Sequence, residues 1–197
     1  MLYIDWIRHT SLQVTGDICY GHSDMPVSDS FEEEAQVVKE RLADRKYDAV
    51  YVSPLSRARL LCEYCGYQDA IVDPRVMERD FGEWEMRRWE DIFALVETSE
   101  GRQYVGQNGE LLPPNGESEF QLLCRVRDFI EDLRTSRYQR VAVFCHGGVI
   151  NSARFFHNDV ELTNLFALVP LYGSITTLGY GKLEERGVLP RGYCRQI

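Results

Sequence analysis

Two arginines and two histidines stand just behind short apolar runs of the sequence, where the ends of β-strands are expected. They are Arg8, His9, Arg57 and His146. Because ligands of open α/β sheets bind beyond the carboxyl ends of the strands, these side chains are expected to meet at one edge. The two glycines after His146 let the N-terminus of a following helix approach a ligand with its backbone N–H groups exposed. In a chain of net charge −9, this local gathering predicts a phosphate site.

The pair of histidines indicates what chemistry such a site performs. A neutral imidazole is a competent nucleophile toward phosphorus, and flanking arginines orient the phosphoryl group and offset the charge on its oxygens. The expected intermediate is therefore a phosphohistidine. The leaving alkoxide then needs a proton from a carboxylic acid. Spacing alone does not choose among four candidates within eight residues, which are Glu78, Asp80, Glu83 and Glu85.

Competing mechanisms fail on spacing. A cysteine phosphatase loop needs an arginine six positions after its cysteine, but Cys145 is followed at that distance by Asn151. The chain also lacks GxSxG, GxxxxGK(S/T) and HExxH motifs, and GxGxxG at a strand-to-helix turn. Taken singly, His9 is more simply a packed core histidine and Arg57 a surface cation. Their joint occurrence behind three apolar runs favours the functional interpretation.

The elements that position these residues follow from hydrophobic patterning. Continuously apolar runs at residues 1–7, 49–53 and 141–145 predict strands buried on both faces, and residues 173–180 suggest a late strand. Helices are predicted between the strands from caps and apolar spacing. Capping boxes at Ser30 and Ser118 mark the expected starts of two helices, and an N-cap at Ser53 marks the start of a third that ends near Cys65. A fourth helix is expected over residues 149–156.

This alternation predicts an α/β fold, a three-layer α/β/α sandwich around a mostly parallel sheet with right-handed crossovers. At roughly 150 residues per domain, the length predicts one domain over residues 1–197. Residues 77–115 differ, because tryptophans lie among many charges while glycines and prolines break the pattern. We expect them to form a short irregular insertion, or cap, over the active-site end of the sheet.

Composition limits the partners of the protein. Without any Lys/Arg-rich run, a net charge of −9 argues against nucleic acid or an anionic membrane, because both need a positive surface. No apolar run approaches the ~18 residues of a membrane span, and the first residues lack the features of a signal peptide, so a cytoplasmic location is expected. The expected partner is a small phosphomonoester substrate. The oligomeric state stays open, with a homodimer as one possibility.

Six cysteines are scattered along a chain large enough to fold without disulfides, so free buried or half-buried thiols are expected. The single CxxC, at residues 62–65, has neither a second CxxC nor a histidine spaced to complete four zinc ligands. We therefore expect no metal there, and neither a metal nor a cofactor at the phosphate site.

Four motifs occur in the order typical of the histidine phosphatase superfamily, which contains the cofactor-dependent phosphoglycerate mutases and their phosphatase relatives. Residues 8–10 resemble its RHG motif, 53–58 its SPLxRA motif, 77–85 its ExxFGxWE motif and 146–148 its HGG motif. The resemblance implies a phosphoglycerate mutase-like fold, with His9 as the phosphorylated nucleophile and Glu78 as the proton donor. It also implies three phosphoryl-binding residues, which are Arg8, Arg57 and His146. Mutases that resemble this chain are usually longer, so water is the expected acceptor.

A narrower resemblance, to the α-ribazole 5′-phosphate phosphatases of cobalamin nucleotide-loop assembly, rests on residues 8–10, 19–21, 24–27 and 31–35. It implies that α-ribazole 5′-phosphate is the substrate. The further phosphate- or substrate-binding residues expected are Thr15, Cys19, Tyr20, Gly21 and Gly147.

Two positions depart from the superfamily pattern. Thr10 replaces the usual glycine, so the backbone there must avoid positive φ, and Thr15 stands where many members carry an asparagine near the phosphate. Neither change removes a group that phosphoryl transfer needs. The alternatives are a phosphatase or weak mutase for another small sugar phosphate, and a catalytically silent phosphate-binding module.

Overall fold

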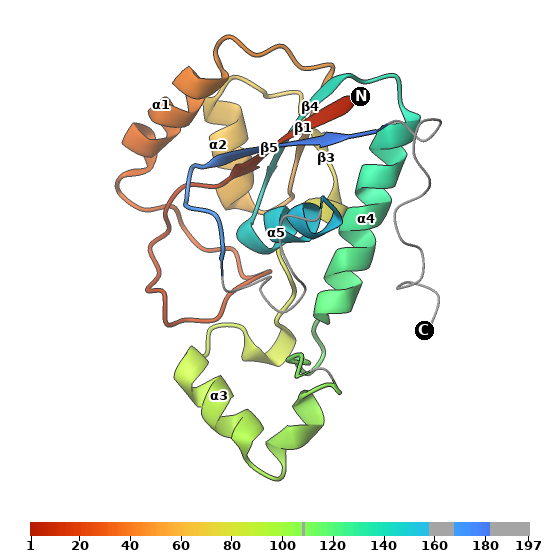
Figure 1. Ribbon diagram of the computed structural model, residues 1–197. Helices are drawn as coiled ribbons and strands as arrows, with labels where there is room; N and C mark the ends of the chain where they lie inside the picture. The colour runs from red at the N-terminus through yellow and green to blue at the C-terminus, as the bar shows by residue number, and fades with distance from the viewer. Residues whose placement is uncertain (108, 158–167, 182–197) are drawn as a thin grey trace.

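The computed structural model describes residues 1–107, 109–157 and 168–181. Its centre is a five-stranded sheet in the order β3-β2-β4-β1-β5 (Figure 1). The strands are β1 (Leu2–Arg8), β2 (Ala49–Val52), β3 (Ile71–Val72), β4 (Arg140–Cys145) and β5 (Ile175–Tyr180). Four strands run parallel and β5 pairs antiparallel with β1. The mostly parallel sheet predicted from the apolar runs is confirmed, and β3 is a short edge strand that the patterning missed.

Helices cover both faces of this sheet. They are α1 (Phe31–Leu42), α2 (Ser56–Tyr64), α4 (Glu119–Thr135) and α5 (Gly147–Phe156). Successive side chains of a strand point to opposite faces. Accordingly Val141, Val143 and Cys145 of β4 pack with α4 and α5, while Ala142 and Phe144 pack with α1 and α2. The three-layer sandwich is therefore the observed architecture.

Of the three predicted helix caps, the one at Ser118 is confirmed, Ser30 is the N-cap of α1 but forms no capping box, and the one at Ser53 is wrong. The capping box at Ser118 is present, since its hydroxyl accepts from the Gln121 backbone N–H at 3.1 Å and Gln121 accepts from the Ser118 N–H at 2.8 Å. The Ser30 hydroxyl instead donates to the Glu34 carboxylate at 2.6 Å and makes no cap bond. Helix α2 begins at Ser56, with Leu55 rather than Ser53 as its N-cap. The Ser53 hydroxyl is thereby available to the site.

The segment after β3 forms a small lobe beyond the sheet (Figure 1). It holds α3 (Trp89–Glu97) and the 3-10 turns Gly82–Trp84 and Gly101–Tyr104, so it is more regular than the sequence suggested. The preceding 3-10 turn, Pro74–Val76, packs in the main core with α4. Its own core is a cluster of Cys19, Phe81, Trp84 and Ile92. Cys19 comes from the loop between β1 and α1, whose backbone also exchanges hydrogen bonds with Met86 and Arg87. This loop and the lobe therefore form one wall.

Two expectations from the sequence concern free thiols and membrane spans. Cys19, Cys62, Cys65 and Cys145 are free thiols, whereas Cys124 on α4 is disulfide-bonded, contrary to expectation. Within the described part of the chain, no helix is both long and apolar enough to cross a membrane.

Candidate active site

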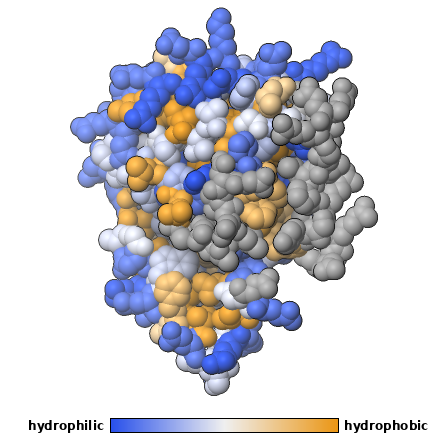
Figure 2. Space-filling view, viewed as in Figure 1, coloured by the Kyte–Doolittle hydropathy of each residue, from blue (hydrophilic) through white to orange (hydrophobic). Residues whose placement is uncertain are grey.

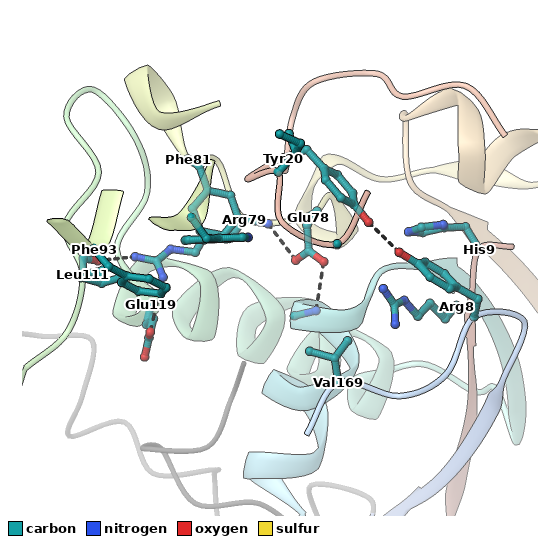
Figure 3. A pocket seen from close by; sticks show the side chains of 15 residues that line it. Arg8, His9, Tyr20, Glu78, Arg79, Phe81, Phe93, Leu111, Glu119 and Val169 are labelled. Atoms are coloured by element: carbon teal, nitrogen blue, oxygen red, sulfur yellow. Dashed lines mark hydrogen bonds and ion pairs between the residues drawn. The ribbon is translucent and has the colours of Figure 1, made fainter. Parts of the chain in front are cut away.

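A cavity of about 530 Å³ opens at the carboxyl ends of β1 and β4 (Figure 3). Its polar end is lined by Arg8, His9, Tyr20, Glu78, Gly148 and Tyr172. Its other end is lined by Ile18, Arg79, Phe81, Trp89, Phe93, Leu111 and Glu119, mostly from the lobe. Gly16 and Val169 complete the lining. The sheet edge thus supplies the chemistry and the lobe supplies the far wall.

His9, the predicted nucleophile, is held as a neutral imidazole. Its side chain is buried, and Nδ1 lies 2.8 Å from the carbonyl oxygen of Thr10. Because a carbonyl oxygen only accepts, Nδ1 carries the hydrogen and Nε2 keeps its lone pair. Burial, reinforced by the charges of Arg57 and Arg8, lowers the pKa of His9 well below its usual value. The φ angle of Thr10 is not positive, so a threonine in place of the usual glycine causes no backbone strain there.

His146 lies beside His9, with 5.2 Å between the ring centroids. It is fully buried, and its Nε2 is 2.7 Å from the Ser53 hydroxyl oxygen, while Nδ1 has no hydrogen-bond partner. Burial, then the nearby Arg57 and His9, lower the pKa of His146 well below its usual value, so the ring is neutral. When Ser53 donates its hydrogen to Nε2, Nδ1 carries the ring hydrogen. His146 does not itself line the cavity, so contact of that N–H with a phosphoryl oxygen stays a prediction.

The two arginines have different positions. Arg8 lines the cavity, donates to the carbonyl oxygen of Pro170, and lies against the ring of Tyr172. Arg57 is fully buried behind the cavity surface. Its terminal nitrogens donate to the carbonyl oxygens of Gly21 at 2.6 Å and Ser23 at 2.9 Å, and its Nε has no partner. Arg57 therefore acts on His9 mainly through its charge.

Glu78 is the one of the four candidate acids that lines the cavity. One carboxylate oxygen accepts from the Arg79 backbone N–H at 2.9 Å and the other from the Gly148 backbone N–H at 3.0 Å. The sequence predicted that the N–H groups at the start of α5 face a ligand. In this structure Glu78 takes the Gly148 N–H, and the helix N-terminus holds the acid beside the nucleophile (Figure 3).

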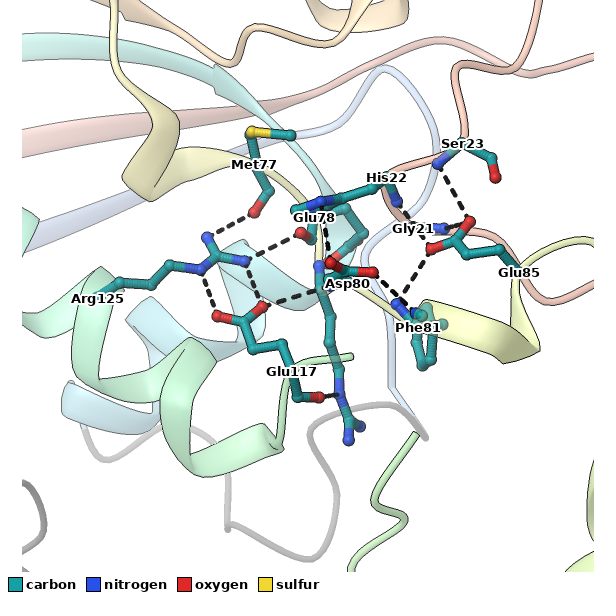
Figure 4. A network of polar contacts seen from close by, with 12 residues as sticks. Gly21, His22, Ser23, Met77, Glu78, Asp80, Phe81, Glu85, Glu117 and Arg125 are labelled. Atoms are coloured by element: carbon teal, nitrogen blue, oxygen red, sulfur yellow. Dashed lines mark hydrogen bonds and ion pairs between the residues drawn. The ribbon is translucent and has the colours of Figure 1, made fainter. Parts of the chain in front are cut away.

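The other three acids serve the framework and do not line the cavity. Glu85 accepts from four backbone N–H groups at 2.9 to 3.1 Å, those of Gly21, His22, Ser23 and Phe81 (Figure 4). Burial acts to raise the pKa of Glu85, but these hydrogen bonds outweigh it and lower the pKa. Asp80 accepts from the Gly82 N–H, and Glu83 accepts from the Asn115 side chain. Placement therefore favours Glu78 among the four candidates.

Of the remaining predicted residues, Tyr20 and Gly147 lie at the site. Tyr20 lines the cavity, and its hydroxyl is 2.8 Å from that of Tyr172. A Cβ on Gly147 would lie 2.2 Å from a methyl carbon of Val169 and 3.5 Å from the guanidinium carbon of Arg8. A glycine is thus needed where α5 passes Arg8.

Three predicted binding residues lie away from the cavity lining. Thr15 is exposed and bonds to Asp17. Cys19 is buried in the lobe cluster. Gly21 is a packing glycine, because a Cβ there would lie 1.8 Å from the carbonyl oxygen of Arg79. The loop packs Cys19 and Gly21 against the segment after β3, a direction that the sequence pattern does not encode.

Sequence reasoning also missed residues that hold the acid in place. Arg125 of α4 donates to the carbonyl oxygens of Arg75, Met77 and Glu78 at 2.7 to 2.9 Å (Figure 4). It also pairs with both carboxylate oxygens of Glu117 at 2.6 and 2.8 Å. The position of Arg125 near the apolar face of its helix could have indicated a structural role. The sequence around it, however, does not show which distant residues it contacts.

A neutral histidine nucleophile, flanked by cations and an acid, meets the needs of phosphoryl transfer through a phosphohistidine. The fold and site together define a phosphoric monoester hydrolase of this type. The chain belongs to the histidine phosphatase superfamily (branch 1), whose family model matches residues 4–189.

Named relatives and solved structures agree with this family. The adenosylcobalamin/alpha-ribazole phosphatase of Escherichia coli K12 is 32% identical over 152 residues, which cover 74% of this chain and 73% of that protein. A metal-independent phosphoserine phosphatase of Arabidopsis thaliana is 27% identical over 154 residues, 74% of this chain but 64% of the longer relative. The alpha-ribazole phosphatase structure from Shigella flexneri superposes with a TM-score of 0.75 at 25% identity, covering 92% of each chain.

Proposed function

We propose that the protein is a metal-independent phosphomonoesterase that acts through a phosphohistidine at His9 and hydrolyses α-ribazole 5′-phosphate. Nε2 of His9 forms the bond to phosphorus as the bond to the alcohol oxygen breaks, and Glu78 gives that oxygen a proton. Water then attacks the phosphohistidine and returns a proton to Glu78. Inorganic phosphate leaves, and both side chains regain their starting states.

The positive charge that this reaction needs comes from protein groups. Arg8 lines the cavity, buried Arg57 acts through its charge, and the Nδ1 hydrogen of His146 is a donor for an equatorial oxygen. Among the residues that the structure describes, no three histidine, cysteine or acidic side chains form a group able to hold a metal ion. Independence from metal stays a prediction that chelation tests.

The observation that carries the substrate assignment is the apolar, aromatic far end of the cavity. Trp89 lies edge-on to Phe81 with centroids 5.3 Å apart, and stacks on Phe93 at 5.8 Å. Phe93 is half exposed, and apolar residues gather over the lobe in Figure 2. A flat, uncharged leaving group such as a benzimidazole nucleoside fits these surfaces, because aromatic rings favour stacked and edge-on contacts.

The charges at this end disfavour alcohols that carry a carboxylate. Arg8 and Arg79 are the cations among the described lining residues. Arg79 is engaged, since it donates to the carbonyl oxygens of Glu117 and Leu111 and pairs with Glu119 at 3.4 Å. Beside it, the pKa of the Glu119 carboxyl is raised by burial. The carboxylate of phosphoserine or phosphoglycerate would thus find no cation besides Arg8 and the engaged Arg79 in this lining, whereas α-ribazole brings no second anionic group.

The test is kcat/KM for a panel of phosphomonoesters, each with EDTA present. The panel holds α-ribazole 5′-phosphate, phosphoserine, 3-phosphoglycerate, glycerol phosphate, glucose 6-phosphate as a small sugar phosphate, and p-nitrophenyl phosphate. We expect α-ribazole 5′-phosphate to lead, with full activity in the chelator. Phe93→Ala should raise KM for α-ribazole 5′-phosphate about tenfold while leaving glycerol phosphate nearly unchanged, because only the larger alcohol reaches the wall.

Other results of this panel would contradict the assignment. A lead for phosphoserine or 3-phosphoglycerate would reject the substrate. A lead for a small sugar phosphate would support the alternative phosphatase or mutase. Turnover of none of these esters would support a silent phosphate-binding module.

A further inference from the structure

Tyr172 contacts the two residues that begin the chemistry. Its ring centroid is 3.9 Å from the guanidinium carbon of Arg8, and 5.5 Å from the ring centroid of His9. Its hydroxyl lies 2.8 Å from that of Tyr20, and both tyrosines line the cavity. None of the motifs that point to the site includes Tyr172.

The backbone just after Tyr172 holds it against the end of β1. The Arg8 N–H donates to the Ser174 carbonyl oxygen at 3.0 Å, and the Gly173 N–H donates to the His9 carbonyl oxygen at 3.1 Å. Gly173 has φ +62°, a turn conformation that glycine adopts without strain. The ring is therefore attached to the same strand end as the residues it contacts.

The orientation of the Arg8 side chain depends on its contacts with Pro170 and Tyr172. An arginine side chain has large rotamer freedom, and fixing it before the ligand arrives improves binding. The guanidinium donates to the Pro170 carbonyl oxygen, but its Nε has no hydrogen-bond partner. The face of Tyr172 supplies the other restraint, an attraction between cation and ring.

Tyr20 in turn restrains Tyr172. Burial, followed by the hydrogen bond to Tyr172, raises the pKa of Tyr20, so its hydroxyl stays protonated. Two phenol groups share one hydrogen in their mutual bond, which fixes the direction of the Tyr172 ring over Arg8.

We propose that Tyr172 is a positioning residue, whose ring fixes the Arg8 guanidinium in the orientation that receives the phosphoryl group. The proposal rests on the phosphate site of the proposed function, but it does not depend on which alcohol leaves. Tyr172 then affects the binding of every phosphate ligand equally, whereas residues of the far wall affect only large alcohols.

The test measures the binding of inorganic phosphate to the full chain by titration calorimetry. Tyr172→Leu should weaken phosphate binding about tenfold or more, because the ring is lost. Tyr172→Phe keeps the ring and should stay within about threefold of the unchanged protein. The matched control is Tyr3→Leu, an exposed tyrosine at the opposite end of β1, which should change nothing.

Kinetics give an independent measurement. Tyr172→Leu should raise KM by the same factor for p-nitrophenyl phosphate and for the preferred substrate. Tyr172 is 39% exposed, so its replacement should leave the fold intact. If Tyr172→Leu does not fold, Tyr172→Gln supplies the ring deletion.

Three outcomes would overturn the proposal. One is unchanged phosphate binding in the folded ring-deleted variant. Another is an equal loss in Tyr172→Phe, which would assign the effect to the hydroxyl. The third is a KM effect limited to one leaving group. Because phosphate binding needs no turnover, a failure of the substrate assignment would leave this measurement interpretable.

Discussion

Ser53 and His146 are joined by a hydrogen bond of 2.7 Å between the serine hydroxyl and Nε2 of the buried imidazole. The Ser53 oxygen also accepts from the Leu55 backbone N–H at 3.3 Å, and its hydroxyl can still donate to the imidazole. When the hydroxyl donates in this bond, the ring hydrogen lies on Nδ1, which has no hydrogen-bond partner. Ser53, near the start of α2, thereby affects which ring nitrogen of His146 carries the hydrogen that a phosphoryl group could accept.

Ser53→Ala should therefore lower kcat/KM about tenfold, because the tautomer that donates from Nδ1 loses its support. Nitrogen NMR of the imidazole should show the change in tautomer directly. Ser152→Ala is the matched control, since this buried hydroxyl donates to the Gly148 carbonyl oxygen and bonds neither histidine. An unchanged tautomer in Ser53→Ala would contradict the assignment.

His9→Ala should abolish the acid-labile phosphoenzyme and reduce turnover to less than about a thousandth. The reason is that His9 presents a free Nε2 lone pair to the cavity while its Nδ1 is held by the Thr10 carbonyl oxygen. Rapid quenching with labelled substrate, followed by peptide mapping, locates the phosphoryl group. Its recovery on another side chain would reject His9 as the nucleophile.

Glu78→Gln should slow a substrate with a poor alkoxide leaving group by on the order of 10² and hardly slow p-nitrophenyl phosphate, whose leaving group needs little help. Glu83→Gln is the control, because Glu83 bonds to Asn115 and does not line the cavity. Equal losses on both substrates, or a larger leaving-group dependence for Glu83→Gln, would move the role away from Glu78.

The stability of the fold should depend on the two buried histidines below neutral pH. Burial lowers the pKa of both His9 and His146 well below the ordinary value, so the folded protein keeps them neutral where the unfolded chain takes up protons. The sign follows directly, because stability falls as the pH drops below about 6.5, by up to about 1.4 kcal/mol per pH unit for each histidine.

Urea unfolding at pH 7.5, 6.5 and 5.5 measures this dependence. His9→Asn should reduce the slope, and the double replacement with His146→Asn should remove most of it in this range. The same slope in the double variant would show that other groups titrate there.

The sequence alone predicted the three-layer α/β/α sandwich and the gathering of histidines and arginines at one edge of its sheet. Apolar runs place residues 8–9 and 146–148 behind strands, and the carboxyl ends of parallel strands meet at one edge. The apolar runs are local signals, because a strand that is buried on both faces needs apolar side chains at consecutive positions. The cap at Ser118 was predictable for the same reason, since both of its bonds close within one helical turn.

The tertiary structure decided which acid faces His9, that Ser53 bonds to His146, and that Tyr172 covers Arg8. It also turned Thr15, Cys19 and Gly21 away from the cavity. Each of these outcomes depends on how a loop packs against an element far along the chain. Composition and periodicity describe the burial of a residue but not its partner, and in this site the partners set tautomer, charge and orientation.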